Sequence, residues 1–234
     1  MNKPDIESLR NQLHMLERAV RAVRANLEVL SVGTPATSAQ APGVIDCPLT
    51  ALLNRPPSID RRSVAPYDAF VPGACVAFPP RSDVITMMAE ARGFTAPNVG
   101  TDAGSSCLML RLQRKASPGP AWATLETEIA PAMIAPLSSL QVRIILSFQS
   151  RHWRPLGSYR VFLRLFFEKE HKDYYPKTFP ALEVPIEGTY RITEEEFAVL
   201  PRLGVREARI IIGLPMLDEA DYMAILSFFE VAGS

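Results

Sequence analysis

Few residues of this 234-residue chain have the types and spacing that catalysis requires. The three histidines and three cysteines do not fall into a metal-ligand spacing, and the cysteine pattern fits no disulfide framework. The sequence also contains no glycine-rich phosphate loop and no serine-hydrolase elbow. We therefore expect no metal and no cofactor.

One pair of carboxylates has a spacing that could serve glycoside hydrolysis. Glu126 and Glu128 lie two residues apart on the same face of an expected strand, which places them ~7 Å apart. A polar strand face exposed to solvent explains the same pattern without any chemistry, and it is the interpretation that we favour. A glycan-active enzyme is therefore the lesser alternative, and we expect the protein not to be an enzyme.

Aromatic side chains point to binding instead. Trp122 falls on the polar face of the same strand, where an exposed indole would form a flat apolar platform for a sugar ring or a partner side chain. Burial of this side chain beneath the proline-rich segment 46–81 is the alternative, which we favour slightly.

Two expected loops add further candidates, because loops carry function more often than cores do, and Arg and Trp are common in binding hot spots. The first loop, residues 150–155, contains two arginines and an indole, and the second, residues 168–177, contains two tyrosines among charges. They flank the strand at 159–168 at opposite ends, so we expect them to form separate surfaces. The candidate ligand-binding residues are Trp122, Arg151, His152, Trp153, Tyr174 and Tyr175.

The elements that would position these residues are strands. From residue 107 onward, apolar and polar residues alternate in segments 108–113, 122–129, 140–149, 159–168, 181–185, 208–213 and 222–231. Seven or so short strands separated by turn residues predict an antiparallel β-sandwich or jelly roll. A capping box at Thr193–Glu196 predicts one helix among them. Segment 82–92 is compatible with either a helix or a strand.

Two of these strands, 159–168 and 222–231, are apolar on both faces. A strand of this kind in an antiparallel sandwich needs cover on its second face. The cover could come from the proline-rich segment, from another subunit or from a ligand.

The strand order resembles that of a known group of folds. The segments LQVRIILSF, GSYRVFLRLFF, GTYRITEEEFAVL, EARIIIGLP and YMAILSFFEV follow one another as in the jelly rolls of carbohydrate-binding modules of the galactose-binding type. In those folds the last strand returns beside the first. The resemblance covers roughly residues 60–234, and it implies a fold and carbohydrate as a class of ligand without implying any individual site residue.

The N-terminal segment has a different period. Apolar residues recur at alternating steps of three and four, which predicts a coiled-coil helix over residues 1–31. A helix packed against its own domain is the alternative. The a and d layers slightly favour a trimer over a dimer, because they do not match the dimer pattern of β-branched a and Leu d residues and contain no buried Asn at an a position. The residues expected to mediate self-association are Ile6, Leu9, Leu13, Leu16, Val20, Val23, Leu27 and Leu30.

Composition sets the remaining expectations. Residues 32–58 are rich in Pro, Ala and Ser and predict a linker, which leaves residues 59–234 for the sandwich. With 25 basic and 25 acidic residues the chain has no net charge, which argues against nucleic-acid binding. No apolar run approaches the about 18 residues of a membrane span, and the N-terminus does not resemble a secretory signal. We therefore expect a cytoplasmic protein, with export by a signal-independent route left open.

Together these features predict a mainly β protein: an antiparallel jelly-roll β-sandwich preceded by a coiled-coil helix. The function that we expect is non-enzymatic binding by a homo-oligomer, with carbohydrate or polysaccharide as the ligand. A structural assembly or scaffold protein, with the aromatic residues buried between subunits, is the main alternative.

Overall fold

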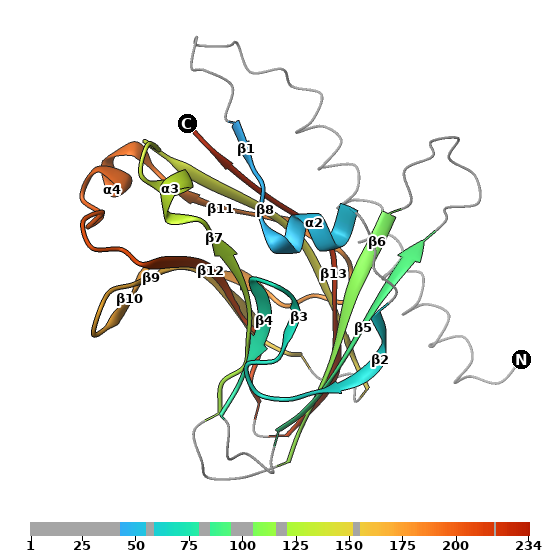
Figure 1. Cartoon of the computed structure of the whole chain (residues 1–234). Coiled ribbons are helices and arrows are strands. Elements are labelled where there is room, and N and C mark those ends of the chain that lie inside the picture. Colours follow the sequence, from blue (N-terminus) through green and yellow to red (C-terminus); the bar gives the residue numbers. More distant parts are fainter. Residues whose placement is uncertain are drawn as a thin grey trace, which may run out of the picture. The chain divides into compact units, whose positions relative to one another are not determined.

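The alternating segments of the chain form strands that pair into two sheets (Figure 1). The computed structural model describes residues 43–54, 59–79, 85–94, 105–115, 121–151, 155–217 and 219–234. The coiled coil predicted for residues 1–31 lies outside these residues.

The first sheet has seven strands in the order β11-β8-β13-β6-β5-β2, with β1 paired to the C-terminal part of β13. Every pairing is antiparallel. The last strand lies between β6 and β8, so it is beside LQVRIILSF, the first of the segments that carry the resemblance. Its strands are β1 (Gly43–Ile45), β2 (Ile59–Val64), β5 (Ile85–Phe94), β6 (Ser105–Arg114), β8 (Leu140–Ser150), β11 (Ile186–Ile192) and β13 (Ala220–Gly233).

The second sheet has six antiparallel strands in the order β10-β9-β12-β7-β4-β3. Its strands are β3 (Ala69–Val71), β4 (Ala74–Ala77), β7 (Thr124–Ile129), β9 (Ser158–Phe166), β10 (His171–Pro180) and β12 (Glu207–Gly213). A mainly β protein built as a sandwich of two antiparallel sheets is therefore confirmed.

The core lies between the inner faces of the two sheets. Phe148 of the first sheet packs against Tyr159 of the second, with ring centroids 5.7 Å apart, and against Tyr222 at 5.8 Å. Aliphatic side chains of β6, β8, β9 and β12 fill the space around these rings and are almost fully buried. This rigid core fixes the backbone of the strands, and with it the side chains that they present outward.

A short helix, α2 (Pro48–Asn54), packs against β13 and β6 of the first sheet and β7 of the second (Figure 1). Leu49, Leu52 and Leu53 are buried, and the Leu49 N–H donates to Thr127 Oγ1 of the second sheet at 3.3 Å. Residues 43–54 fall inside the range predicted to be a linker, yet they complete the core. They contain one Pro, one Ala and no Ser, and the helical spacing of the three leucines supplies a buried face.

Two other short helices, α3 (Pro131–Ile134) and α4 (Glu194–Ala198), connect strands. The capping box predicted at Thr193–Glu196 is confirmed: Thr193 Oγ1 accepts from the Glu196 N–H, and the Glu196 side chain accepts from the Thr193 N–H. None of the helices among the described residues is long and apolar enough to cross a membrane.

The structure differs from the sequence-based prediction around β10. Residues 171–177 of the loop predicted at 168–177 belong to this edge strand, β10 (His171–Pro180), whereas residues 181–185, predicted as a strand, connect β10 to β11. An edge strand faces solvent along much of its length, so its sequence lacks the apolar alternation of an inner strand. The ambiguous segment 82–92 contributes most of β5.

A bulge between Tyr174 and Lys177 interrupts the pairing of β10 with β9. The buried hydroxyl of Tyr190 fills the gap in the ladder: it accepts from the Leu163 N–H at 3.2 Å and donates to the Tyr174 carbonyl at 3.3 Å. Burial raises the pKa of Tyr190, so the hydroxyl stays protonated and able to donate.

Candidate functional site

The outer face of the second sheet carries a groove of about 690 Å³. Side chains alternate between the two faces of a strand. In β9 every second residue points into the core, and the residues between them face outward: Arg160, Phe162 and Arg164. The N-terminal end of β7, the C-terminal end of β12 and the turn before β3 complete the groove. Its lining residues are Tyr67, Ala121, Trp122, Ala123, Thr124, Ser158, Arg160, Phe162, Arg164, His171, Gly213, Leu214 and Met216.

The floor of the groove follows the strand register. Gly213 of β12 is paired with Arg160 of β9 on one side and with Thr124 of β7 on the other. Adjacent strands lie about 4.8 Å apart, so Arg160 and Thr124 face each other across roughly 10 Å. Since Gly213 has no side chain, the space between them remains open.

Two aromatic rings form one wall. Trp122 precedes β7 and is 37% exposed, and its ring centroid lies 6.3 Å from that of Tyr67, which is 56% exposed. Tyr67 belongs to the proline-rich segment 46–81, so this segment flanks Trp122 and leaves part of its indole accessible.

The backbone of Tyr67 is strained. The turn from Ala65 to Asp68 is closed by a hydrogen bond from the Asp68 N–H to the Ala65 carbonyl, and Tyr67 has a φ of 63° at its third position. That conformation favours glycine, and a bulky residue held there costs on the order of 1 kcal/mol. Strain of this kind clusters at binding sites, where it positions a side chain.

A network of charges lies beside the groove on the same sheet face. The Arg209 guanidinium of β12 donates to Glu126 at 2.9 Å and Glu128 at 3.3 Å on β7, and to Glu207 on its own strand. The Arg209 guanidinium carbon also lies 5.2 Å from the centre of the Phe166 ring. Glu126 is 4% exposed, and its second oxygen accepts from Thr124 Oγ1 at 2.7 Å. The strand face predicted to be exposed to solvent is thus a largely buried ion-pair network.

This network perturbs the groups within it. Burial lowers the pKa of Arg209, but the hydrogen bonds that its guanidinium donates to Glu207 and Glu126 outweigh this effect, so the pKa is raised. Burial and the neighbouring Glu126 raise the pKa of the Cys75 thiol to about 11, so Cys75 is a protonated thiol at neutral pH.

A second guanidinium of this sheet face, that of Arg164, also forms an ion pair. Arg164 donates to both carboxylate oxygens of Asp173, on β10, at 2.6 and 2.9 Å, and its guanidinium carbon lies 5.5 Å from the centre of the Phe162 ring. Arg160 differs from both arginines. It is exposed in the groove, and its side chain makes no hydrogen bond or ion pair with any residue that the structure describes.

The candidate residues predicted from sequence do not meet in one place. Trp122 lines the groove, whereas Tyr174 and Tyr175 are half-buried on β10, where the Tyr175 hydroxyl donates to the Glu196 carbonyl at 2.8 Å. Arg151 follows β8 of the first sheet. His152 and Trp153 lie outside the described residues.

Arg151 and its neighbours form an ion-pair cluster rather than part of the groove. The guanidinium of Arg151 lies 3.5 Å from Asp221, which also accepts two hydrogen bonds from Arg111 at 3.2 Å. Burial raises the pKa of Asp221, but hydrogen bonds from Arg111 and Gln113 outweigh this effect, so the pKa lies below its usual value.

Sequence analysis missed Tyr67, Arg160, Arg164 and His171 as groove residues. For Arg160 and Arg164 the sequence does carry a signal, because both lie on the second face of the strand at 159–168, the face that needs cover. What the sequence did not show is that β7 and β12 lie beside this face and that a turn far away in the chain supplies a ring.

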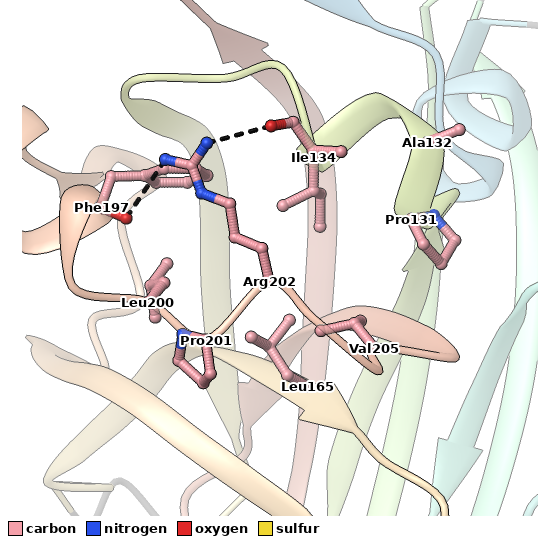
Figure 2. Close-up of a pocket in the computed structure, with 10 residues that line it drawn as sticks. Pro131, Ala132, Ile134, Leu165, Phe197, Leu200, Pro201, Arg202 and Val205 are labelled. Atoms are coloured by element: carbon pink, nitrogen blue, oxygen red, sulfur yellow. Dashed lines mark hydrogen bonds between the residues drawn. The ribbon is translucent and has the colours of Figure 1, made fainter.

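A second, smaller cavity of about 270 Å³ lies between α3 and α4 (Figure 2). Its lining is apolar except for Arg202, whose guanidinium donates to the Ala135 carbonyl at 3.0 Å and to the Phe197 carbonyl at 3.4 Å. Figure 2 shows this side chain reaching across the cavity mouth between the two helices. Because its donors are used to join the helices, the cavity offers little to orient a polar ligand. No group of three or more potential metal ligands occurs in the described part of the chain.

Comparisons with known proteins concern the architecture. No family model and no curated protein matches the sequence. The solved structures with similar folds include a CBM4 carbohydrate-binding module, with a TM-score of 0.47 and 10% identity over 77% of this chain and 99% of that one. They also include the CBM22-1 xylan-binding domain of Paenibacillus barcinonensis Xyn10C, with a TM-score of 0.43 and 8% identity over 84% and 97% of the two chains.

A third similar structure is the Stig cyclase Fisc from Fischerella sp. TAU, with a TM-score of 0.46 and 15% identity over 83% of this chain and 98% of that one. The similar structures thus include carbohydrate-binding modules, the group whose strand order this sequence resembles. At these identities no site residue is carried over from those proteins.

Proposed function

We propose that the protein binds carbohydrate in the groove on the outer face of the second sheet. The observation that carries this proposal is the pair of accessible rings, Trp122 and Tyr67, beside a row of hydrogen-bonding side chains on rigid strands. A sugar ring has an apolar face that packs on an aromatic platform and hydroxyls around its edge that need donors and acceptors. The groove supplies both.

The strained turn at Tyr67 supports the same proposal. A glycine at this position would relieve the backbone, whereas tyrosine places an exposed ring next to Trp122. A residue that costs stability and contributes an exposed ring is better explained by binding than by packing.

The proposed activity is binding without catalysis. Glycoside hydrolysis needs two carboxyl groups, one acting as an acid and the other as a base or nucleophile. Glu126 and Glu128 instead share the guanidinium of Arg209, and Glu126 is almost completely buried. Both side chains have a structural role in this arrangement, which joins β7 to β12.

We further propose that the heptad repeat of residues 1–31 assembles several copies, so that several grooves engage one polysaccharide. Tethered sites bind far more tightly than single ones when both can be occupied at once. Light scattering should give a trimer or dimer for the full chain and a monomer for a chain beginning at Ser31. A monomer in both cases would refute self-association through the helix.

Binding is tested with two aromatic variants and a matched control. Full-length wild type, Trp122→Ala and Tyr67→Gly are compared on a panel of soluble polysaccharides by affinity electrophoresis. Both variants should lose at least about tenfold in affinity, while Tyr67→Gly should melt no lower than wild type because the turn is relieved. Leu203→Ala removes an equally apolar side chain, 95% exposed and outside the groove, and should bind normally.

Two results would contradict the proposal. The first is a protein that retains all its polysaccharide binding in both aromatic variants. The second is an indole at position 122 that acrylamide cannot quench in the full-length protein but can quench in the chain beginning at Ser31, measured in a Trp153→Phe background. That result would place Trp122 between subunits and favour a structural assembly.

A further inference from the structure

We propose that the groove is selective for anionic carbohydrate and that Arg160 binds the carboxylate or sulfate of the sugar. This inference rests on the proposed function and specifies its class of ligand.

The charged side chains that line the groove are basic. Arg160, Arg164 and His171 line it, and none of its described lining residues is an Asp or Glu. The acidic side chains of this sheet face lie outside the lining and are ion-paired: Asp173 binds Arg164, and Glu126, Glu128 and Glu207 share Arg209. A neutral ligand has no use for the positive charge that remains.

That charge belongs mainly to Arg160. The other two guanidiniums of the outer face, those of Arg164 and Arg209, are held by carboxylates at 2.6 to 3.3 Å. Arg160 has no such partner among the residues that the structure describes. A guanidinium presents a planar fork of N–H donors that matches the two oxygens of a carboxylate or sulfate group.

The floor beside Arg160 is shaped for a ring. Arg160 and Thr124 flank Gly213, and Trp122 lies two residues before Thr124. A sugar resting over Gly213 would therefore have an aromatic platform on the Trp122 side and the guanidinium on the other. A Cβ added to Gly213 would lie 3.7 Å from the Arg160 Cβ and 4.0 Å from Phe162 Cε1, which are ordinary contact distances. A side chain can therefore start from this position without a clash at its Cβ, and it would extend into the floor of the groove.

The test compares charged and neutral forms of the same polymer. Polygalacturonate is paired with its fully methyl-esterified form, and dextran sulfate with dextran, so that carboxylate and sulfate are tested separately. Affinities for the full-length protein are measured by biolayer interferometry at 50 and 300 mM NaCl. We expect at least one acidic polymer to bind about tenfold or more tightly than its neutral partner, and this preference to shrink at the higher salt concentration.

Three variants assign the effect to the groove. Arg160→Gln should remove the preference, because it should lower the affinity for the acidic polymer at least about tenfold more than the affinity for the neutral partner. Arg191→Gln, which removes the same charge from the first sheet, should retain the preference. Gly213→Leu should abolish binding of both forms while the protein melts within a few degrees of wild type.

The outcomes separate this inference from the proposed function. Equal binding of charged and neutral polymers, with Arg160→Gln silent, would overturn the anionic selectivity while carbohydrate binding stands. An acidic preference that Arg191→Gln removes as well as Arg160→Gln would show non-specific charge attraction and would also overturn it. If no polymer binds but a tetraglutamate peptide binds in an Arg160-dependent way, both the inference and the proposed function fail.

Discussion

Replacement of Arg209 by methionine tests the network that supports the groove face. Methionine retains most of the side-chain volume and removes the charge that neutralises Glu126, Glu128 and Glu207. The three carboxylates differ in exposure, with side-chain accessibilities of 5%, 44% and 35% respectively. Most of the cost should therefore come from Glu126, which is left charged and nearly buried.

The magnitude follows from that burial. Removing one partner of a buried ion pair costs about 3–5 kcal/mol, and Glu126 keeps one hydrogen bond from Thr124, so we expect the lower end, about 3 kcal/mol. In a domain of this size, that corresponds to a fall in melting temperature of roughly 6–12 °C. Glu128→Ala removes a half-exposed partner and should cost about 1 kcal/mol or less.

Guanidinium chloride unfolding of the full-length protein measures these differences, provided that the m-value is unchanged. The double variant Arg209→Met/Glu126→Gln carries no unpaired buried charge and should recover about 2 kcal/mol relative to Arg209→Met. The reasoning is wrong if Arg209→Met costs less than about 1 kcal/mol, or if Glu128→Ala costs as much as Arg209→Met does.

Three further changes probe the parts of the fold that hold this face in place. Tyr190→Phe leaves the buried N–H and carbonyl at the β10 bulge without a partner and should cost about 1–3 kcal/mol in chemical denaturation. Leu49→Ala creates a cavity at a fully buried position of α2 and should lower the free energy of unfolding by about 2–5 kcal/mol. The exposed control Leu203→Ala should change it by less than about 0.5 kcal/mol, as would Leu49→Ala if residue 49 belonged to a linker. The pKa of Asp221 is lowered in the folded protein, so its stabilising contribution is complete above about pH 5 and is lost as the pH falls below about 4. Thermal melts at a series of pH values should therefore show a smaller loss of stability over that range for Asp221→Asn than for wild type.

Local sequence determined much of the architecture. Alternating residues specify the inner strands such as β8 and β9, because a strand with one buried face must repeat every two residues. The capping box at Thr193 specifies the start of α4, because its two hydrogen bonds form within four residues of chain. These features depend on neighbours in sequence, so they can be predicted without knowledge of the sheets.

The edge strand β10 could not be predicted in the same way, and the stability of α2 depends on contacts far away in the chain. The polar residues of β10 pair only because β9 is already fixed beside them, and the Tyr190 hydroxyl repairs the ladder at the bulge. The short α2 is stable only because two sheets enclose its leucines, since an isolated helix of this length does not form in water.

The groove was decided by tertiary structure. The sequence shows Trp122 as a candidate platform and shows Arg160 on a strand face that needs cover, but 38 residues separate them. Sheet pairing through Gly213 brings their strands within two strand spacings of each other, and the turn at Tyr67 adds the second ring. The type of residue at each position is a property of the sequence. Which residues share a groove depends on strand order, and strand order is set by contacts between segments far apart in the chain.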